Sequence, residues 1–112
     1  MSSDDDEFKS ERKRLQELMI SKADISMKRF LNLDSSVYNE GVIDRRTKEL
    51  LGLVASTVLR CDDCIKYHLN TCFENGLKDR ELVEAMDIAL VVGGSITIPH
   101  IRRAFDYWES LK

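Results

Sequence analysis

Hydrophobic residues in the first third of the chain recur at steps of three and four positions, with charged residues between them. The positions that follow this step are Phe8, Leu15, Leu18, Met19, Ala23, Met27, Phe30 and Leu31. This spacing is typical of an amphipathic helix. It predicts one long helix over about residues 8–33, after a disordered acidic tail over residues 1–7.

The segment that follows predicts a turn and then a helix without charge on any side. Polar residues over 34–36 and Asn39-Glu40-Gly41 supply turn chemistry, and Asp44 can cap the next helix. Residues 50–59 carry no charge, so we expect that helix to be buried all round. Arg60 ends it.

Three further helices are predicted in the second half. One covers residues 61–75 and ends at a glycine, the next runs from about 78 to 92 and ends at Gly93-Gly94, and the last begins near Ser95 with Pro99 in its first turn. The inward side chains expected in the last two are Leu82, Val83, Met86, Ala89, Leu90, Ile98, Ile101, Phe105 and Trp108. No alternating strand pattern competes, so the sequence predicts a single all-α domain over residues 8–112, a bundle of about five helices.

Charge and composition exclude several classes of protein. Residues 4–7 hold four of the 20 acidic residues. The rest of the chain has 16 acidic residues and 17 Lys and Arg, so it is nearly neutral and lacks the basic footprint of a nucleic-acid binder. The longest uncharged run is too short to span a bilayer, and the acidic start is unlike a secretory signal. We therefore expect a cytoplasmic protein with no nucleic-acid or membrane partner. A chain of 112 residues buries a modest core, which favours a homo-oligomer.

The candidate chemistry lies in Cys61-x-x-Cys64-x-x-x-His68. If this segment is helical, the two thiols lie on neighbouring turns with β-carbons about 5 to 6 Å apart, close enough for a disulfide after a small adjustment. The partial positive charge of a helix N-terminus favours thiolate over thiol, and His68 follows one turn later. A C-x-x-C in an intracellular chain indicates redox or metal chemistry. Cys72 is interpreted as a small core residue.

Glu49 is expected to approach His68 across a helical hairpin. With the reversal near Arg60, the two lie about 16 and 12 Å along their helices at 1.5 Å per residue. Glu49 also precedes the uncharged run, at the edge of an apolar interior, which suits a carboxyl that moves protons. The predicted relay runs from Glu49 through His68, directly or through water, to Cys64, with Cys61 completing the disulfide.

Other interpretations remain open at this point. The cysteines fit two inert buried thiols, and Cys61, Cys64, His68 and Glu49 fit a zinc site less well, because structural zinc draws ligands from two separate pairs. His68 alone fits a core histidine, and Glu49 an acid favoured in an early helical turn.

Three neighbouring residues carry weaker signals. Arg60 either lowers the proton affinity of a thiol or faces solvent. Tyr67 is expected to point elsewhere on its helix. His100 borders the site or merely caps a helix.

These residues resemble the carboxymuconolactone decarboxylase and alkylhydroperoxidase D family. The resemblance rests on Lys48-Glu49-Leu50, an apolar helix, Cys61-x-x-Cys64-x-x-x-His68, Asn75-Gly76, Glu84-Ala85 and Gly93-Gly94. It covers about residues 40–105, and the positions of the glutamate and the histidine relative to the cysteines make it specific.

The resemblance implies an AhpD-like all-helical subunit that assembles as a trimer or hexamer. In the peroxidase branch, the cysteines alternate between dithiol and disulfide while the glutamate and histidine relay protons. By position, Cys64 would react with peroxide, Cys61 would resolve, and Glu49 and His68 would form the relay. Electrons in that branch come from a lipoylated or thioredoxin-like partner, with a peroxiredoxin as a further acceptor.

One departure bears on reactivity. The best-studied branch has a histidine directly before the second cysteine, whereas this chain has Asp63, whose negative charge disfavours a thiolate if it faces the site. We therefore predict a thiol oxidoreductase acting on peroxide or a partner disulfide, with no cofactor and no metal. The alternatives are a decarboxylase-type lyase, which needs no cysteine, and a non-catalytic oligomer or thiol-based redox sensor.

Overall fold

The computed structural model describes residues 4–112, and its described elements are helical throughout. Their bounds are α1 (Asp4–Lys22), α2 (Ile25–Val37), α3 (Arg45–Val58), α4 (Asp62–Glu74), α5 (Asp79–Gly93), a 3-10 turn η1 (Ser95–Thr97) and α6 (Ile98–Ser110). Residues 4–112 contain no strand. The predicted all-α class is confirmed.

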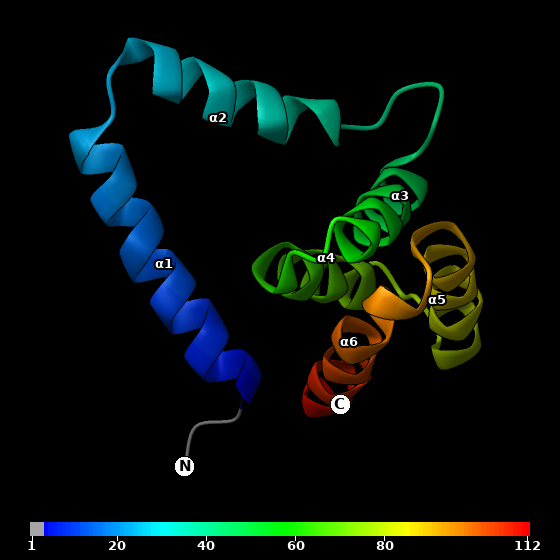
Figure 1. Cartoon of the computed structure of the whole chain (residues 1–112). Coiled ribbons are helices and arrows are strands. Elements are labelled where there is room, and N and C mark those ends of the chain that lie inside the picture. Colours follow the sequence, from blue (N-terminus) through cyan, green and yellow to red (C-terminus); the bar gives the residue numbers. More distant parts are fainter. Residues whose placement is uncertain (1–3) are drawn as a thin grey trace.

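Four helices form the body of the protein and two extend from it. Figure 1 shows α3, α4, α5 and α6 gathered together, while α1 and α2 form an arm that bends away from them. No residue of α1 or α2 is buried. The arm returns to the body at the start of α1, where Phe8 packs edge-on against Tyr107 with 5.6 Å between ring centroids.

The first predicted helix is wrong in its extent, because the chain forms two helices where one was expected over residues 8–33. Asp24 has an extended backbone, and its side chain accepts a hydrogen bond from the Met27 amide at 2.9 Å. This N-cap starts a new helix while the hydrophobic step continues across the break. Residues 4–112 therefore form six α-helices rather than about five.

The predicted acidic tail also differs from the structure. Helix α1 already includes Asp4, Asp5, Asp6 and Glu7, which fill its first turn. Carboxylates are favoured there because the unpaired N–H groups of a helix start carry partial positive charge. Residues 1–3 of the predicted tail lie outside the described residues.

The core lies between α3, α4, α5 and α6. Its buried members are Leu53, Ile65, Leu69, Cys72, Leu77, Leu82, Met86, Ala104, Tyr107 and Trp108. The Trp108 indole also donates a hydrogen bond to Asp79 Oδ1 at 2.7 Å, which ties α6 to the first turn of α5. This packing holds α3 and α4, the two helices that carry the candidate residues, against each other.

Several hydrophobic residues predicted to be buried lie at the surface. Leu51 on α3 and Leu59, the C-cap residue after it, are 56% and 76% exposed, so the uncharged segment is not buried all round. Val83 and Phe105 are also exposed. The reason is that the other helices pack on one side of α3 and α5, and absence of charge does not reveal which faces are covered. No helix in residues 4–112 is both long enough and apolar enough to cross a membrane.

Candidate functional site

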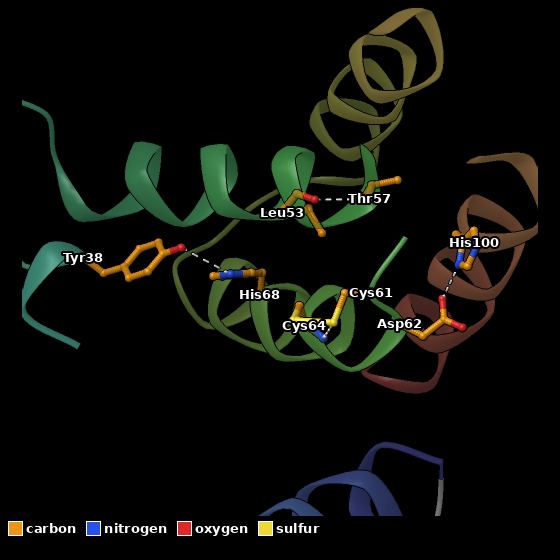
Figure 2. The surroundings of a disulfide bond; sticks show 8 residues. All are labelled: Tyr38, Leu53, Thr57, Cys61, Asp62, Cys64, His68 and His100. Carbon is orange, nitrogen blue, oxygen red and sulfur yellow. Dashed lines mark hydrogen bonds and ion pairs between the residues drawn. A yellow bond between two sulfur atoms is a disulfide. The ribbon is translucent and has the colours of Figure 1, made fainter. Parts of the chain in front are cut away.

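Cys61 and Cys64 form a disulfide at the N-terminus of α4. Cys61 is the N-cap residue, with an extended backbone (φ −99°, ψ 97°), and its sulfur accepts a hydrogen bond from the Cys64 amide at 3.3 Å. The Cα atoms are 5.3 Å apart. Helix α4 begins at Asp62, one residue after the predicted start, so the pair spans the helix terminus as Figure 2 shows.

The turn before the cysteines explains why Cys61 falls at this position. Arg60 has a positive φ of 62°, the left-handed conformation that ends a helix. The Cys61 amide then donates to the Ser56 carbonyl at 3.1 Å. The Arg60 side chain is exposed, so the residue serves the reversal between α3 and α4.

Glu49 and His68 are in direct contact across the α3–α4 hairpin, as their spacing predicted. His68 Nδ1 lies 2.9 Å from Glu49 Oε2, and the two residues are 7% and 1% exposed. The Thr71 hydroxyl, one turn after His68, donates to the same carboxylate oxygen at 3.1 Å. When the Glu49 side chain is an ionised carboxylate it can only accept hydrogen bonds, and Nδ1 of His68 is then the donor in this contact.

Two residues that the sequence did not single out complete the surroundings of His68. The Tyr38 hydroxyl lies 3.4 Å from His68 Nε2 (Figure 2). Gly52 lies beside both rings, since a Cβ there would be 2.7 Å from His68 Cε1 and 2.7 Å from the Tyr38 oxygen. A glycine in a helix interior costs stability and marks a close approach, which was the available signal for Gly52. Tyr38 had none, because it follows α2 in a turn segment.

Cys64 opens onto a cavity that also contains His68. Its volume is about 320 Å³ and its lining residues are Arg12, Asp34, Tyr38, Ser56, Asp63, Cys64, Tyr67 and His68. Tyr67 therefore borders the site, against the prediction, and the Arg12 guanidinium lies over its ring at 4.2 Å. Asp63, the departure noted in the sequence, also lines this cavity and so shares it with Cys64. A larger cavity of about 470 Å³ between α1 and α4 has no cysteine in its lining.

His100 lies in a separate cluster on the other side of the cysteine turn (Figure 2). Its Nδ1 is 2.8 Å from Asp62 Oδ1, and Arg103 Nε donates to Asp62 Oδ2 at 3.0 Å. Burial opposes ionisation of Asp62, but the bond to His100 and the charge of Arg103 outweigh it and lower the Asp62 pKa. These contacts anchor α6 to the first turn of α4.

Cys72 is a buried residue of the core, where the sequence placed it. It is a free thiol, and burial together with the negative charge of Glu49 raises its pKa to about 12. Such a thiol is almost entirely protonated near neutral pH, so it does not compete with the disulfide pair. Within residues 4–112, no three His, Cys, Asp or Glu side chains are grouped so as to hold one metal ion.

Comparison with solved structures supports this architecture. A protein from Thermotoga maritima of known crystal structure is 58% identical to this chain, with a TM-score of 0.92 over 94% of this chain and 92% of that one. A carboxymuconolactone decarboxylase family protein from Legionella pneumophila, solved in its apo form, has a TM-score of 0.86 over 96% of both chains. At 21% identity, that second likeness concerns the fold alone.

Two curated proteins match parts of the chain. The alkyl hydroperoxide reductase AhpD of Corynebacterium kroppenstedtii is 34% identical over 64 residues, which are 57% of this chain and 37% of that protein. Uncharacterised protein 4 of the cox locus of Paracoccus denitrificans is 28% identical over 75 residues, 67% of this chain and 68% of that one. The chain thus spans little more than a third of the Corynebacterium protein.

The sequence profile of the carboxymuconolactone decarboxylase family matches residues 26–107, from the second residue of α2 into α6. That range contains Glu49, both cysteines of the disulfide and His68, together with the helices that hold them. The family resemblance predicted from the sequence is confirmed, and this chain belongs to the carboxymuconolactone decarboxylase family.

Proposed function

We propose that this protein is a thiol oxidoreductase of the alkylhydroperoxidase D type. The observation that carries the proposal is the Cys61–Cys64 disulfide, with Cys64 on a cavity whose wall includes His68 in contact with buried Glu49. A thiol pair at a helix N-terminus beside a histidine–carboxylate pair has the parts that reversible thiol oxidation needs.

The proposed cycle begins with the reduced pair. The Cys64 thiolate attacks the terminal oxygen of a peroxide, the O–O bond breaks, and an alcohol or water leaves with one proton while the sulfur becomes a sulfenic acid. Cys61 then attacks that sulfur, the disulfide forms, and water leaves. His68 and Glu49 take up the thiol proton and return it to the departing oxygen. The pair has lost two electrons, which the peroxide has gained.

A dithiol partner returns the two electrons by thiol–disulfide exchange and becomes a disulfide itself. A lipoylated or thioredoxin-like protein fits this chemistry, and a peroxiredoxin fits as an alternative electron acceptor. Two relatives point the same way: one is named alkyl hydroperoxide reductase, and the Thermotoga protein has a suggested role in antioxidative response. A C-x-x-C that is reduced and reoxidised also fits the cytoplasm, where thiol reductants are available.

We also propose that the protein works as a homo-oligomer, a trimer or a hexamer. The support is apolar surface that this chain leaves uncovered, on α2 at Phe30, on α3 and its C-cap at Leu51 and Leu59, and on α5 at Val91 and Val92. Monomers rarely leave large contiguous apolar patches exposed, and burying them against other copies is favourable. Light scattering of the purified protein tests this, and a monomer at micromolar concentration would contradict it.

Thiol counting tests the redox proposal. The reduced protein is treated with one equivalent of peroxide, and free thiols and disulfides are measured by a colorimetric reagent and mass spectrometry. We expect two thiols to be lost in the wild type and in Cys72→Ala, and no disulfide in Cys64→Ser. Glu49→Gln should slow the reaction by about a hundredfold or more, the usual scale of acid–base assistance, whereas exposed Glu84→Gln should not.

The outcome that contradicts the proposal is a wild-type protein whose Cys61 and Cys64 stay unreactive near neutral pH. The lyase alternative then gains support if lactone turnover is present and survives in Cys64→Ser. A pair that oxidises once and is not reduced by any dithiol donor would instead favour a sensor.

A further inference from the structure

Tyr38 engages the free side of His68. Its hydroxyl is 3.4 Å from Nε2, and the two rings lie 5.2 Å apart between centroids. The other ring nitrogen, Nδ1, is already bound to Glu49. Both nitrogens of His68 therefore have a partner, a carboxylate on one side and a phenol on the other.

The backbone on either side of Tyr38 is held in place from α3. Lys48 Nζ donates to the Val37 carbonyl at 2.9 Å and to the Asn39 carbonyl at 2.7 Å. These two residues flank Tyr38, and Lys48 is the neighbour of Glu49 in the sequence. The first turns of α3 therefore position both partners of His68.

Gly52 supplies the space in which Tyr38 and His68 meet. Any side chain at position 52 would put its Cβ at 2.7 Å from the Tyr38 oxygen and at 2.7 and 2.9 Å from two atoms of the imidazole. Because such separations are shorter than van der Waals contact, the rings could not lie together on this face of α3 if residue 52 had a Cβ. The contact thus depends on a glycine in the helix interior.

The protonation of His68 decides whether the Tyr38 hydroxyl donates to Nε2 or accepts from it. With Glu49 as an ionised carboxylate that accepts, Nδ1 carries a hydrogen, and in a neutral imidazole Nε2 must then accept. Burial, followed by the negative charges of Glu49 and Asp34, raises the pKa of Tyr38 above 10.0. The phenol therefore keeps its proton near neutral pH and is available as the donor to Nε2.

We infer that Tyr38 is a positioning residue for His68: its hydroxyl selects the tautomer protonated at Nδ1 and holds Nε2 at the wall of the cavity that contains Cys64. When the imidazole takes up a proton, the same oxygen accepts from Nε2–H, so the ring keeps its orientation in both states. The role of this arrangement in thiol oxidation rests on the proposed function. The effect of Tyr38 on the His68 tautomer is independent of that function.

Titratable and charged groups approach His68 from every element around it. They are Arg12 from α1, Asp34 and Tyr38 from α2 and the turn after it, Glu49 from α3, and Asp63, Cys64 and Tyr67 from α4. Of these, Glu49 and Tyr38 have a hydrogen-bonding contact with the ring. Substitution of Tyr38 therefore changes one of the two hydrogen-bonding contacts of the His68 ring and leaves the surrounding charges in place.

The test is Tyr38→Phe, with Tyr107→Phe as the matched control. Tyr107 is a buried tyrosine of α6 that also has one side-chain hydrogen bond, from Asn70 at 2.8 Å, and lies outside the site. Nitrogen NMR of the two histidines, with His68 assigned by comparison with a His100→Gln sample, reports the tautomer. The pH profile of Cys64 alkylation in the reduced protein reports the reactivity.

In the wild type and in Tyr107→Phe we expect the Nδ1-protonated tautomer of His68. In Tyr38→Phe we expect a mixture of tautomers, with Cys64 alkylation slower by about threefold to tenfold at neutral pH, the ratio that one lost net hydrogen bond produces. If Tyr38→Phe unfolds, Lys48→Met loosens the same tyrosine without removing it and should shift the tautomer in the same direction.

The inference is overturned if a folded Tyr38→Phe, or Lys48→Met where that variant replaces it, retains the wild-type tautomer and alkylation profile. Its failure differs from failure of the proposed function. A wild-type protein that does not form the disulfide with peroxide, while Tyr38→Phe changes the tautomer, refutes the function and supports the positioning role. Normal disulfide formation in the wild type, together with an unchanged tautomer in Tyr38→Phe, supports the function and refutes the positioning role.

Discussion

Gly52→Ala tests whether the packing around His68 is as close as the structure has it. In an exposed helix interior, replacing glycine by alanine stabilises the helix by about 1 kcal/mol. At Gly52 the added Cβ would lie 2.7 Å from His68 Cε1 and from the Tyr38 oxygen. The two rings would have to move by about 0.7 Å to reach the 3.4 Å at which ordinary contact begins.

The movement has two measurable consequences. The Tyr38–His68 separation, 3.4 Å, is already near the limit for a hydrogen bond, so the displacement breaks it. Overpacking at a closely packed site costs about 1 to 3 kcal/mol, which cancels or exceeds the helical gain. We therefore expect Gly52→Ala to lower the free energy of unfolding, or leave it unchanged, and to slow Cys64 alkylation to the extent expected for Tyr38→Phe.

Urea unfolding and alkylation kinetics of the reduced protein measure both quantities. Gly41→Ala is the control, because the nearest atom to its added Cβ is Lys48 Nζ at 3.6 Å, an ordinary contact. We expect that variant to stay within about 0.5 kcal/mol of the wild type. A Gly52→Ala protein that is about 1 kcal/mol more stable than the wild type and alkylates at the wild-type rate would refute the reasoning.

Three other substitutions probe the core, the buried thiol and the surface. The raised pKa of Cys72, about 12 against 9.0, makes its thiolate fraction near neutral pH about a thousandfold smaller than that of an unperturbed thiol, so mass spectrometry should find it alkylated only after unfolding. Because the raised pKa disfavours the native state only where the unfolded thiol ionises, its stabilising contribution is fully present below pH 9. Above pH 9 the free energy of unfolding should fall by up to about 1.4 kcal/mol per pH unit, and Cys72→Ala should lack this fall. Leu53→Ala should cost about 2 to 5 kcal/mol in urea unfolding because the side chain is fully buried, and a cost below 1 kcal/mol would contradict its place in the core. Arg46→Ala should leave the urea unfolding midpoint almost unchanged, since its ion pair with Glu81 is 40% and 39% exposed, and a clear fall in the midpoint would show that this α3–α5 contact is stronger than exposed pairs usually are.

The candidate relay could be predicted because its geometry is short-range. Cys64 and His68 lie on α4 and Cys61 is its N-cap residue, so their spacing alone brings the three close together. Glu49 lies on the preceding helix, joined by a tight reversal, and the rise per residue was enough to bring it beside His68. Errors in such an estimate stay small because both helices start from the same turn.

The arm formed by α1 and α2 was predicted less well. Periodicity alone could not detect the break at Asp24, because the hydrophobic step continues on both sides of it while a single side chain caps the new helix. The expectation that residues 50–59 are buried all round failed for a related reason. A run without charges shows that burial is possible, whereas the faces of α3 that are covered depend on where α4 and α5 pack.

The sequence by itself determined the helical class, the thiol pair at a helix start and the histidine–glutamate contact, since each depends on residues within one helix or one hairpin. Only the tertiary structure decided that Tyr38 contacts His68 and lines the cavity beside Cys64. Its hydroxyl reaches His68 across 30 positions of sequence, through a turn held by Lys48 and over a face of α3 left open by Gly52. A contact of that kind depends on the crossing of three separately packed elements, which no local pattern of residues encodes.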